Sequence, residues 1–299
     1  MRVFAPAKLN LYLRVVGRRA DGFHELETLF ERLDLADELV LTDQPRGITL
    51  SSDHPTLDCG LENLVVKAAQ LLQDITGTAK GVSIRLTKRI PVAAGLGGGS
   101  SDGASALLGL NRFWRLGVTL DHLKELGAGL GSDVPFFLDE RPFSVGRGRG
   151  ERCEPVTGRM PQLWHVLVAP PVALSTKDVF AGWDAGQTAL TESVPSITMV
   201  LHALRNGSLR ELAGGLWNDL QPEAIRRCPV IQEIQTHVTR AGCVGAVTSG
   251  SGPSVFGLCQ DAAHAAQAAQ SIRQHGSQEW SVQVVTTWSG SVIANGEAS

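Results

Sequence analysis

Hydrophobic and polar residues alternate near the start of the chain. Every odd position from 9 to 15 is leucine or valine, and the even positions between them carry asparagine, tyrosine and arginine. A period of two residues is typical of a strand with one buried face. The alternation therefore predicts a strand over residues 9–15, and apolar runs predict two further strands over 37–42 and 82–87.

A helical period follows in residues 62–76, where apolar residues recur every three or four positions. Gly77 comes directly after this segment and is a typical helix stop. The stripe that we expect to be buried consists of Leu64, Ala68, Leu71, Leu72 and Ile75. The same period predicts a helix whose apolar face runs from Ala104 to Phe113, and a shorter helix over 120–131.

The second half of the chain mixes helical and strand patterns. Helices are predicted over 175–184, 208–220, 229–242 and 261–274, and strands over 244–250, 254–259 and 281–287. Strands occur both in succession and around helices, which predicts an α+β fold. A chain of 299 residues fits two compact units, and we expect a boundary near residue 158, which gives domains over 1–158 and 159–299.

The composition narrows the class of protein. Apolar residues make up 43% of the chain and charged residues 19%, and the formal net charge is −3. This balance gives no overall field that would attract nucleic acid or an acidic membrane. The five cysteines are scattered without a C-x-x-C pair, and no long apolar run is present. We therefore expect a cytoplasmic protein without disulfides or a zinc site.

The strongest candidate for chemistry is the glycine-rich segment PVAAGLGGGSSDGASALLGLN, residues 91–111. Glycines in front of a helix let backbone N–H groups approach a phosphate closely, and the helix dipole favours the anion. No lysine follows the glycines as a Walker loop requires, and the spacing G-x-G-x-x-G is absent. Taken alone, the segment is equally typical of a phosphate loop and of a flexible turn from a strand to a helix.

Three motifs in order along the chain resemble those of the GHMP kinases, the superfamily of galactokinase, homoserine kinase, mevalonate kinase and phosphomevalonate kinase. They are PAKLNL at residues 6–11, the glycine loop with its order P-x-x-x-G-L-G-x-G-S-S, and TSGSGPSVFGL at residues 248–258. The resemblance implies a ribosomal-protein-like N-terminal domain, a ferredoxin-like C-terminal domain and an active site in the cleft between them. It also implies ATP and Mg²⁺, the metal held through ATP and water rather than by a set of protein ligands, with Ser101 as a candidate protein oxygen.

A fourth segment, RADGFHELETLF at residues 19–30, resembles one branch of this superfamily, the 4-diphosphocytidyl-2-C-methyl-D-erythritol kinases of non-mevalonate isoprenoid synthesis. LGSDVPFFL, residues 130–138, supports the same resemblance. It implies transfer of the γ-phosphate of ATP to the 2-hydroxyl of a substrate that carries a cytidine diphosphate group. We expect no nucleic-acid or membrane partner and a monomer or homodimer.

The resemblance assigns roles to particular residues. Asp133 is the expected catalytic base, Lys8 the expected cation at the hydroxyl, and Asn10 is expected to place the substrate. Without the resemblance, Asp133 would be interpreted as a turn or N-cap residue and Lys8 as an exposed strand lysine. The residues expected at ATP are Asn63, Pro91, Val92, Ala93, Ala94, Gly95, Leu96, Gly97, Gly98, Gly99, Ser100 and Ser101.

Phe23 and His24 are the expected pocket for the cytosine base, closed from the second half by Phe180. An aromatic ring stacks on a pyrimidine, and an imidazole can form hydrogen bonds with the edge of the base. The family usually has tyrosine where this chain has Phe23, which keeps the stacking face and removes a hydroxyl. For Phe180, the helix core is an equally good interpretation, since a Val-Phe pair on a helix is often buried.

Two questions stay open at this stage. Arg147, Arg149 and Arg152 stand among glycines, where they fit either the substrate diphosphate or a solvated hairpin. Two other functions also compete: a kinase of homoserine or of a mevalonate derivative, and a ribosomal-protein-like module that binds RNA. A dinucleotide-dependent oxidoreductase is excluded by the loop spacing.

Overall fold

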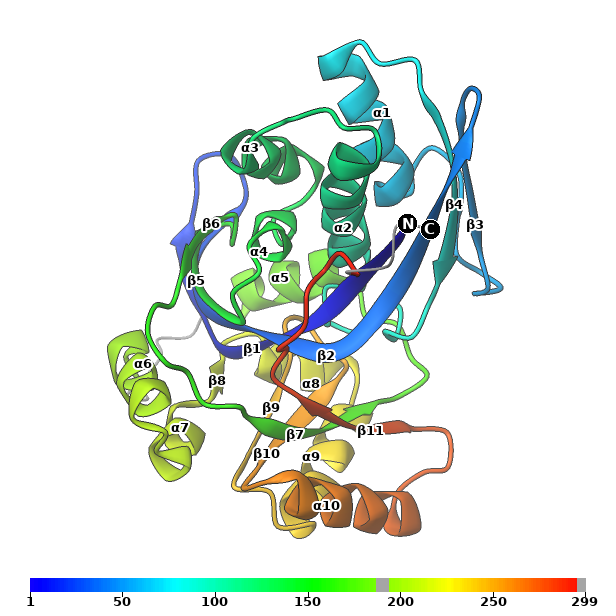
Figure 1. The fold of residues 1–299 in the computed structure, drawn as a ribbon. Helices are drawn as coiled ribbons and strands as arrows, with labels where there is room; N and C mark the ends of the chain where they lie inside the picture. Colours follow the sequence, from blue (N-terminus) through cyan, green and yellow to red (C-terminus); the bar gives the residue numbers. More distant parts are fainter. Residues whose placement is uncertain (187–193, 295–299) are drawn as a thin grey trace.

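The computed structural model describes residues 1–186 and 194–294, and it folds into four layers: helices, a large sheet, a small sheet and helices (Figure 1). The large sheet has the strand order β3-β4-β2-β1-β8, with β5 paired to β2 and β6 to β5. Its strands are β1 (Arg2–Arg18), β2 (His24–Gln44), β3 (Ile48–Ser52), β4 (Gly81–Thr87), β5 (Phe143–Gly148), β6 (Arg152–Pro155) and β8 (Trp217–Asn218).

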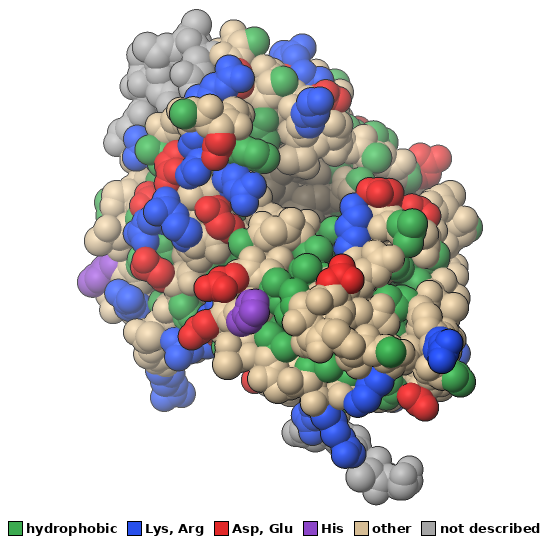
Figure 2. Space-filling view, turned by 90° about the horizontal axis from the view of Figure 1, so that it is seen from above, with side chains coloured by type: hydrophobic (Ala, Val, Ile, Leu, Met, Phe, Trp, Pro, Cys, Tyr) green, Lys and Arg blue, Asp and Glu red, His purple; other side chains and the backbone are tan. Residues whose placement is uncertain are grey.

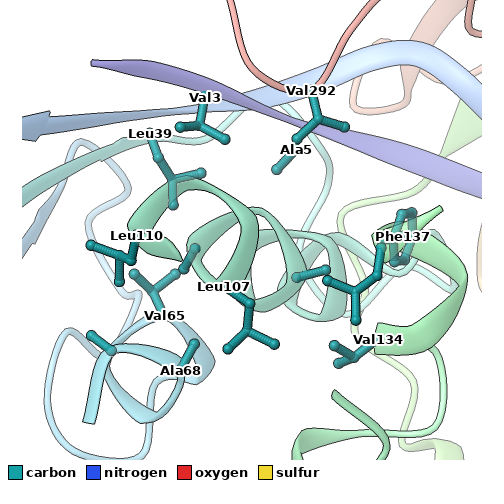
Figure 3. Packing of buried hydrophobic residues seen from close by; sticks show 14 of the residues in the cluster. Val3, Ala5, Leu39, Val65, Ala68, Leu107, Leu110, Val134, Phe137 and Val292 are labelled. Atoms are coloured by element: carbon teal, nitrogen blue, oxygen red, sulfur yellow. The ribbon is translucent and has the colours of Figure 1, made fainter. Parts of the chain in front are cut away.

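Four helices cover one face of the large sheet, and α2 is their centre (Figure 1). They are α1 (Leu64–Thr76), α2 (Gly98–Phe113), α3 (Leu120–Leu130) and α4 (Val134–Leu138). Figure 3 shows α2 between β1, which carries Val3, and α1, which carries Ala68, with Leu107 of α2 on the side of Ala68. Val292, close to the end of the chain, completes this core and is 1% exposed.

The small sheet has the order β11-β7-β10-β9 and is antiparallel throughout. Its strands are β7 (Trp164–Ala169), β9 (Gly245–Thr248), β10 (Val255–Cys259) and β11 (Ser281–Thr286). With α9 (Val230–Arg240) between β7 and β9 and α10 (Ala262–His275) between β10 and β11, the connectivity is βαββαβ. This is the ferredoxin-like arrangement, so the expected fold of the second half is confirmed.

The inner faces of the two sheets pack against each other. Leu9 and Leu29 of the large sheet share one buried cluster with Leu167, Phe256 and Val285 of the small sheet. The outer face of the small sheet packs on α9 and α10. The remaining helices of the second half are α5 (Thr176–Ala185), α6 (Ile197–Asn206), α7 (Leu209–Gly215) and α8 (Gln221–Arg227).

Two local expectations are corrected by the structure. The helix predicted over 208–220 ends at Gly215, because Trp217 and Asn218 leave it to pair in parallel with Tyr12 and Leu13 of β1. In α1, Gly77 does end the helix in a left-handed conformation, but Ile75 of the expected stripe is 40% exposed. The buried side chains of α1 are Val65, Val66, Ala68, Ala69 and Leu72.

Candidate active site

A cavity of about 1140 Å³ opens between the helical side of the large sheet and the second half of the chain. Figure 2 shows that this molecule is hollowed on the face seen from above, with hydrophobic and charged side chains around the hollow. The cavity is lined by β1, β2, the glycine loop and residues 132–133 before α4 from the first half, and by α5 and the loop after β9 from the second. One space therefore receives side chains from every predicted motif.

The glycine loop packs closely against other segments of the chain. Gly95 and Gly97 have φ angles of +77° and +69°, a region that L residues with side chains rarely adopt. A Cβ on Gly95 would lie 2.2 Å from the carbonyl oxygen of Ser249, and a Cβ on Gly97 would lie 3.0 Å from Cγ of Lys8. The loop ends at Gly98, where α2 begins and its first backbone N–H groups are left without helical partners.

Lys8 and Asn10 form a buried polar network at the floor of the cavity. Nζ of Lys8 donates to Oδ1 of Asn10 at 2.5 Å, and Nδ2 of Asn10 donates to the hydroxyl of Thr28 at 2.8 Å. That hydroxyl donates in turn to the carbonyl of Tyr12 at 2.6 Å. Because each group is held by the next, the lysine and the amide keep fixed positions.

Asp133 faces this network from the opposite side. Its Oδ2 lies 3.7 Å from Nζ of Lys8, and its side chain is 31% exposed, so one side remains open to the cavity. Asp133 occupies the N-cap position of α4 but makes no capping hydrogen bond with its side chain. Burial lowers the pKa of Lys8 below that of a free lysine, while the Asp133 carboxylate opposes this effect.

An aromatic cluster lies at another part of the cavity wall. The rings of His24 and Phe180 are stacked, with centroids 4.7 Å apart and planes 24° apart. Trp183 contacts His24 edge-on, with the two ring centroids 5.7 Å apart. Oδ1 of Asp184 lies 2.8 Å from Nε2 of His24. α5 carries all three partners of His24, so the second half of the chain holds this ring in place.

The loop after β9 joins the two halves at the glycine loop. The hydroxyl of Ser249 donates to the carbonyl of Gly95 at 3.0 Å, and Asn218 of β8 donates to the carbonyls of Thr248 and Gly250. A Cβ on Gly250 would lie 3.2 Å from Nζ of Lys8. The motif at residues 248–258 therefore packs directly against the glycine loop and against Lys8 of the motif at residues 6–11.

Two family models match the sequence, one in each half of the chain. Residues 63–140 match the family model of the GHMP kinases N terminal domain, and residues 200–278 match that of the GHMP kinases C terminal domain. The chain belongs to the GHMP kinase family. The family and the α+β fold predicted from the motifs are thereby confirmed.

Within the GHMP kinases, several similar curated relatives share one name. The 4-diphosphocytidyl-2-C-methyl-D-erythritol kinase of Bacillus pumilus is 42% identical over 86% of this chain and 87% of its own length. The enzyme of the same name from Pelotomaculum thermopropionicum is 41% identical over 90% of this chain and 93% of its own length. These identities confirm the resemblance of the chain to this branch, which residues 19–30 had indicated.

Solved structures of GHMP kinases agree in fold. A crystal structure of a 4-(cytidine 5'-diphospho)-2C-methyl-D-erythritol kinase superposes with a TM-score of 0.81 at 36% identity, covering 96% of this chain and all of that one. A homoserine kinase from Cytophaga hutchinsonii superposes with a TM-score of 0.76 at 21% identity, covering 96% of this chain and 94% of that chain, which shows a shared fold alone.

Nearly all residues expected at the site line the cavity of this GHMP kinase. Lys8, Asn10, Phe23, His24, Asn63, Asp133 and Phe180 line it, together with residues 91–100 of the glycine loop. Ser101 is the exception, because its side chain is fully buried in α2 and does not line the cavity. Asn63 lines the cavity and also caps α1, since its Oδ1 accepts from the backbone N–H of Val65.

A buried charged cluster escaped the sequence analysis. Nζ of Lys88 donates to Oδ2 of Asp37 and, at 2.8 Å, to Oδ2 of Asp102, and all three side chains are nearly inaccessible to solvent. Lys88 and Asp102 line the cavity beside the glycine loop. Burial raises the pKa of Asp102 to about 7, although the neighbouring Lys88 ammonium opposes the rise. Asp102 belongs to the glycine-rich segment 91–111, but no pattern in the neighbouring sequence indicated that Lys88 is its partner.

Proposed function

We propose that the chain transfers the γ-phosphate of ATP to the 2-hydroxyl of 4-diphosphocytidyl-2-C-methyl-D-erythritol. The observation that carries this proposal is the convergence of three features in one cavity: a glycine loop before α2, the Lys8–Asp133 pair and the ring cluster around His24. Relatives about 40% identical over most of the chain bear the name of this kinase. Residues 1–158 would bind ATP and most of the substrate, and residues 159–299 would close the cleft.

Phosphoryl transfer requires a base for the hydroxyl proton and positive charge near the oxygen that attacks. Asp133 would accept the proton of the substrate 2-hydroxyl as its oxygen attacks the γ-phosphorus. The Lys8 ammonium, 3.7 Å from Asp133, would stabilise the negative charge that develops on that oxygen. Asn10 holds Lys8 by a hydrogen bond and would help to place the hydroxyl.

The glycine loop would hold the triphosphate. At the start of α2 the backbone N–H groups and the helix dipole both favour an anion, and the glycines let phosphate oxygens approach the backbone closely. Asn63 and the apolar residues of the loop would contact the remainder of ATP. The side chains that would contact the cytosine are Phe23, His24 and Phe180.

Mg²⁺ would be bound mainly through the phosphates and water. Within residues 1–186 and 194–294, no cluster of three acidic, histidine or cysteine side chains is placed to hold a metal ion by itself. The hydroxyl of Ser101 is buried with no hydrogen-bond partner among the described residues, and Ser100 lines the cavity. Of these two hydroxyls, only that of Ser100 belongs to a residue that lines the cavity, and such a hard oxygen fits Mg²⁺, which would neutralise charge on the phosphates.

The competing function as an RNA-binding module has little support. On the face shown in Figure 2, Lys and Arg side chains are interspersed with Asp and Glu and do not form a broad basic surface. No helix in the described residues is both long and apolar enough to cross a membrane. A small-molecule substrate inside the cavity explains the site better than a polyanion on the surface.

Phosphorus NMR of the protein with Mg-ATP and 4-diphosphocytidyl-2-C-methyl-D-erythritol tests the proposal. We expect a new phosphomonoester signal and ADP with the wild-type chain, and a rate at least about 10²-fold lower with Asp133→Asn. Equal thermal unfolding temperatures of the two proteins would exclude misfolding of the variant. ADP formed with homoserine or mevalonate but not with the cytidine compound would contradict the proposed substrate and retain the kinase chemistry.

A further inference from the structure

The hairpin formed by β5 and β6 carries three arginines, and two of them are held by acidic partners. Arg147 donates to Glu154 at 3.2 Å and lies 3.8 Å from Glu27. Arg152 donates to Glu25 at 2.7 Å. Neither Arg147 nor Arg152 lines the cavity, so both belong to the outer surface of the hairpin.

Arg149 stands in a different environment. It lines the cavity, and its guanidinium carbon lies 4.9 Å from the ring centroid of Phe23. Its side-chain polar contacts among the described residues are long: 3.5 Å from Nη2 to the carbonyl of Ala128 and 4.0 Å from Nε to Glu151. A guanidinium has five N–H donors, so most of the donors of Arg149 are available to a ligand.

The position of Arg149 along the cavity is defined by its neighbours. On one side lies Phe23, which is followed in the chain by His24 of the ring cluster. On the other side Gly150 approaches the catalytic carboxylate, since a Cβ on Gly150 would lie 3.7 Å from Oδ1 of Asp133. Arg149 is therefore placed between the expected base pocket and the expected base catalyst.

We propose that Arg149 binds the diphosphate of the substrate. The inference rests on the proposed function and deepens it. The order of groups in the substrate is cytosine, ribose, diphosphate and methylerythritol, and the order of residues along the cavity is Phe23, Arg149 and Asp133. A planar guanidinium can stack on an aromatic ring with its face and form paired hydrogen bonds to phosphate oxygens with its edge.

Calorimetric titration with CDP and with cytidine tests this role without turnover. We expect Arg149→Gln to weaken CDP binding about 10- to 100-fold, because charge-assisted hydrogen bonds to the diphosphate are lost, and to change cytidine binding less than about threefold. The matched control is Arg147→Gln on the same hairpin, which should bind both ligands as the wild-type chain does. Arg149→Lys keeps the charge without the planar fork, so we expect an intermediate loss.

The outcomes separate this inference from the proposed function. If Arg149→Gln weakens CDP and cytidine by the same factor, or weakens neither, Arg149 does not bind the diphosphate, and the inference is wrong. If the wild-type chain binds neither ligand and does not phosphorylate the cytidine substrate, the proposed function itself fails. In steady-state assays, we expect Arg149→Gln to raise the KM for the substrate while the KM for ATP is unchanged.

Discussion

The ammonium nitrogen of Lys8 lies 3.7 Å from a carboxylate oxygen of Asp133, although the lysine is 4% exposed and the Asp133 side chain is 31% exposed. The two groups are thus unequally solvated. Water reaches the carboxylate, whereas the ammonium depends on Asp133 and on Oδ1 of Asn10 to stay charged. The pKa of Lys8 is lowered because burial exceeds the stabilising effect of Asp133.

We predict that deprotonation of Lys8 limits activity at alkaline pH. Because the Lys8 pKa is lowered, the ammonium loses its proton below the pH at which a free lysine does. The profile of kcat/KM against pH should therefore fall on the alkaline side before pH reaches about 10.4. In Lys8→Arg the guanidinium stays charged, so the fall should move to higher pH. An alkaline limb at the same pH in both proteins would assign it to another group.

Gly97→Ala should weaken ATP binding and destabilise the protein by about 1–3 kcal/mol. The new Cβ would require a left-handed backbone with a side chain and would press against Lys8 and Phe137, each 3.0 Å away. Gly214→Ala, in α7 and outside the cavity lining, is the control, since its Cβ meets nothing within 4 Å. Calorimetry with ATP and urea unfolding measure the two effects. Equal behaviour of the two variants would show that the geometry of Gly97 is unimportant.

Asp184→Asn should impair recognition of the base without affecting ATP. Asp184 lies 2.8 Å from Nε2 of His24 and fixes the orientation of that ring against Phe180. We expect the KM for the cytidine substrate to rise by roughly tenfold, equivalent to about 1.4 kcal/mol, while the KM for ATP stays constant. Asp178→Asn, at an exposed position of the same helix, should change neither constant. A parallel rise in both constants would point to a general disturbance of α5.

Asp102→Asn should change how stability depends on pH. The pKa of Asp102 is raised to about 7, so the folded state keeps a proton that the unfolded chain releases near pH 4. The stabilising contribution is complete at low pH and is lost as pH rises through 7. The free energy of unfolding of the wild-type chain, relative to the variant, should fall between pH 4 and 7 by up to about 1.4 kcal/mol per pH unit.

Urea unfolding at pH 5, 6 and 7 gives this comparison. Asp74→Asn, on the surface of α1, serves as the control and should follow the pH dependence of the wild-type chain. Parallel curves for Asp102→Asn and the wild-type chain would mean that Asp102 is ionised throughout this range.

Local patterns in the sequence predicted much of the fold because they record which faces are buried. The alternation over 9–15 lies inside β1, and Gly77 ends α1 as its position indicated. The segment 208–220 was mispredicted because Trp217 and Asn218 pair with β1 at the other end of the chain. No local period can reveal such a partner.

The candidate site was predicted through its motifs, and its supporting groups were not. The glycine loop and PAKLNL identified residues that do meet in one cavity. Phe180 was predicted at the base pocket, but the contacts of Trp183 and Asp184 with His24 were missed. The Lys88–Asp37 pair was also missed, since its members are 51 positions apart and neither belongs to a motif. Contacts between distant positions determine which charges are neutralised, and these depend on the completed fold.

The burial of Val292 determines when the core of the helical layer can be completed during synthesis. It is buried among side chains of β1 and α2, and its carbonyl accepts a hydrogen bond from the backbone N–H of Phe4 at 2.7 Å. The backbone N–H of Ala294 likewise donates to the carbonyl of Arg2. Two segments that lie far apart in the sequence, residues 2–4 and 292–294, therefore close one core together. Because both segments must be present, the helical layer reaches its final packing only after residue 292 has been translated.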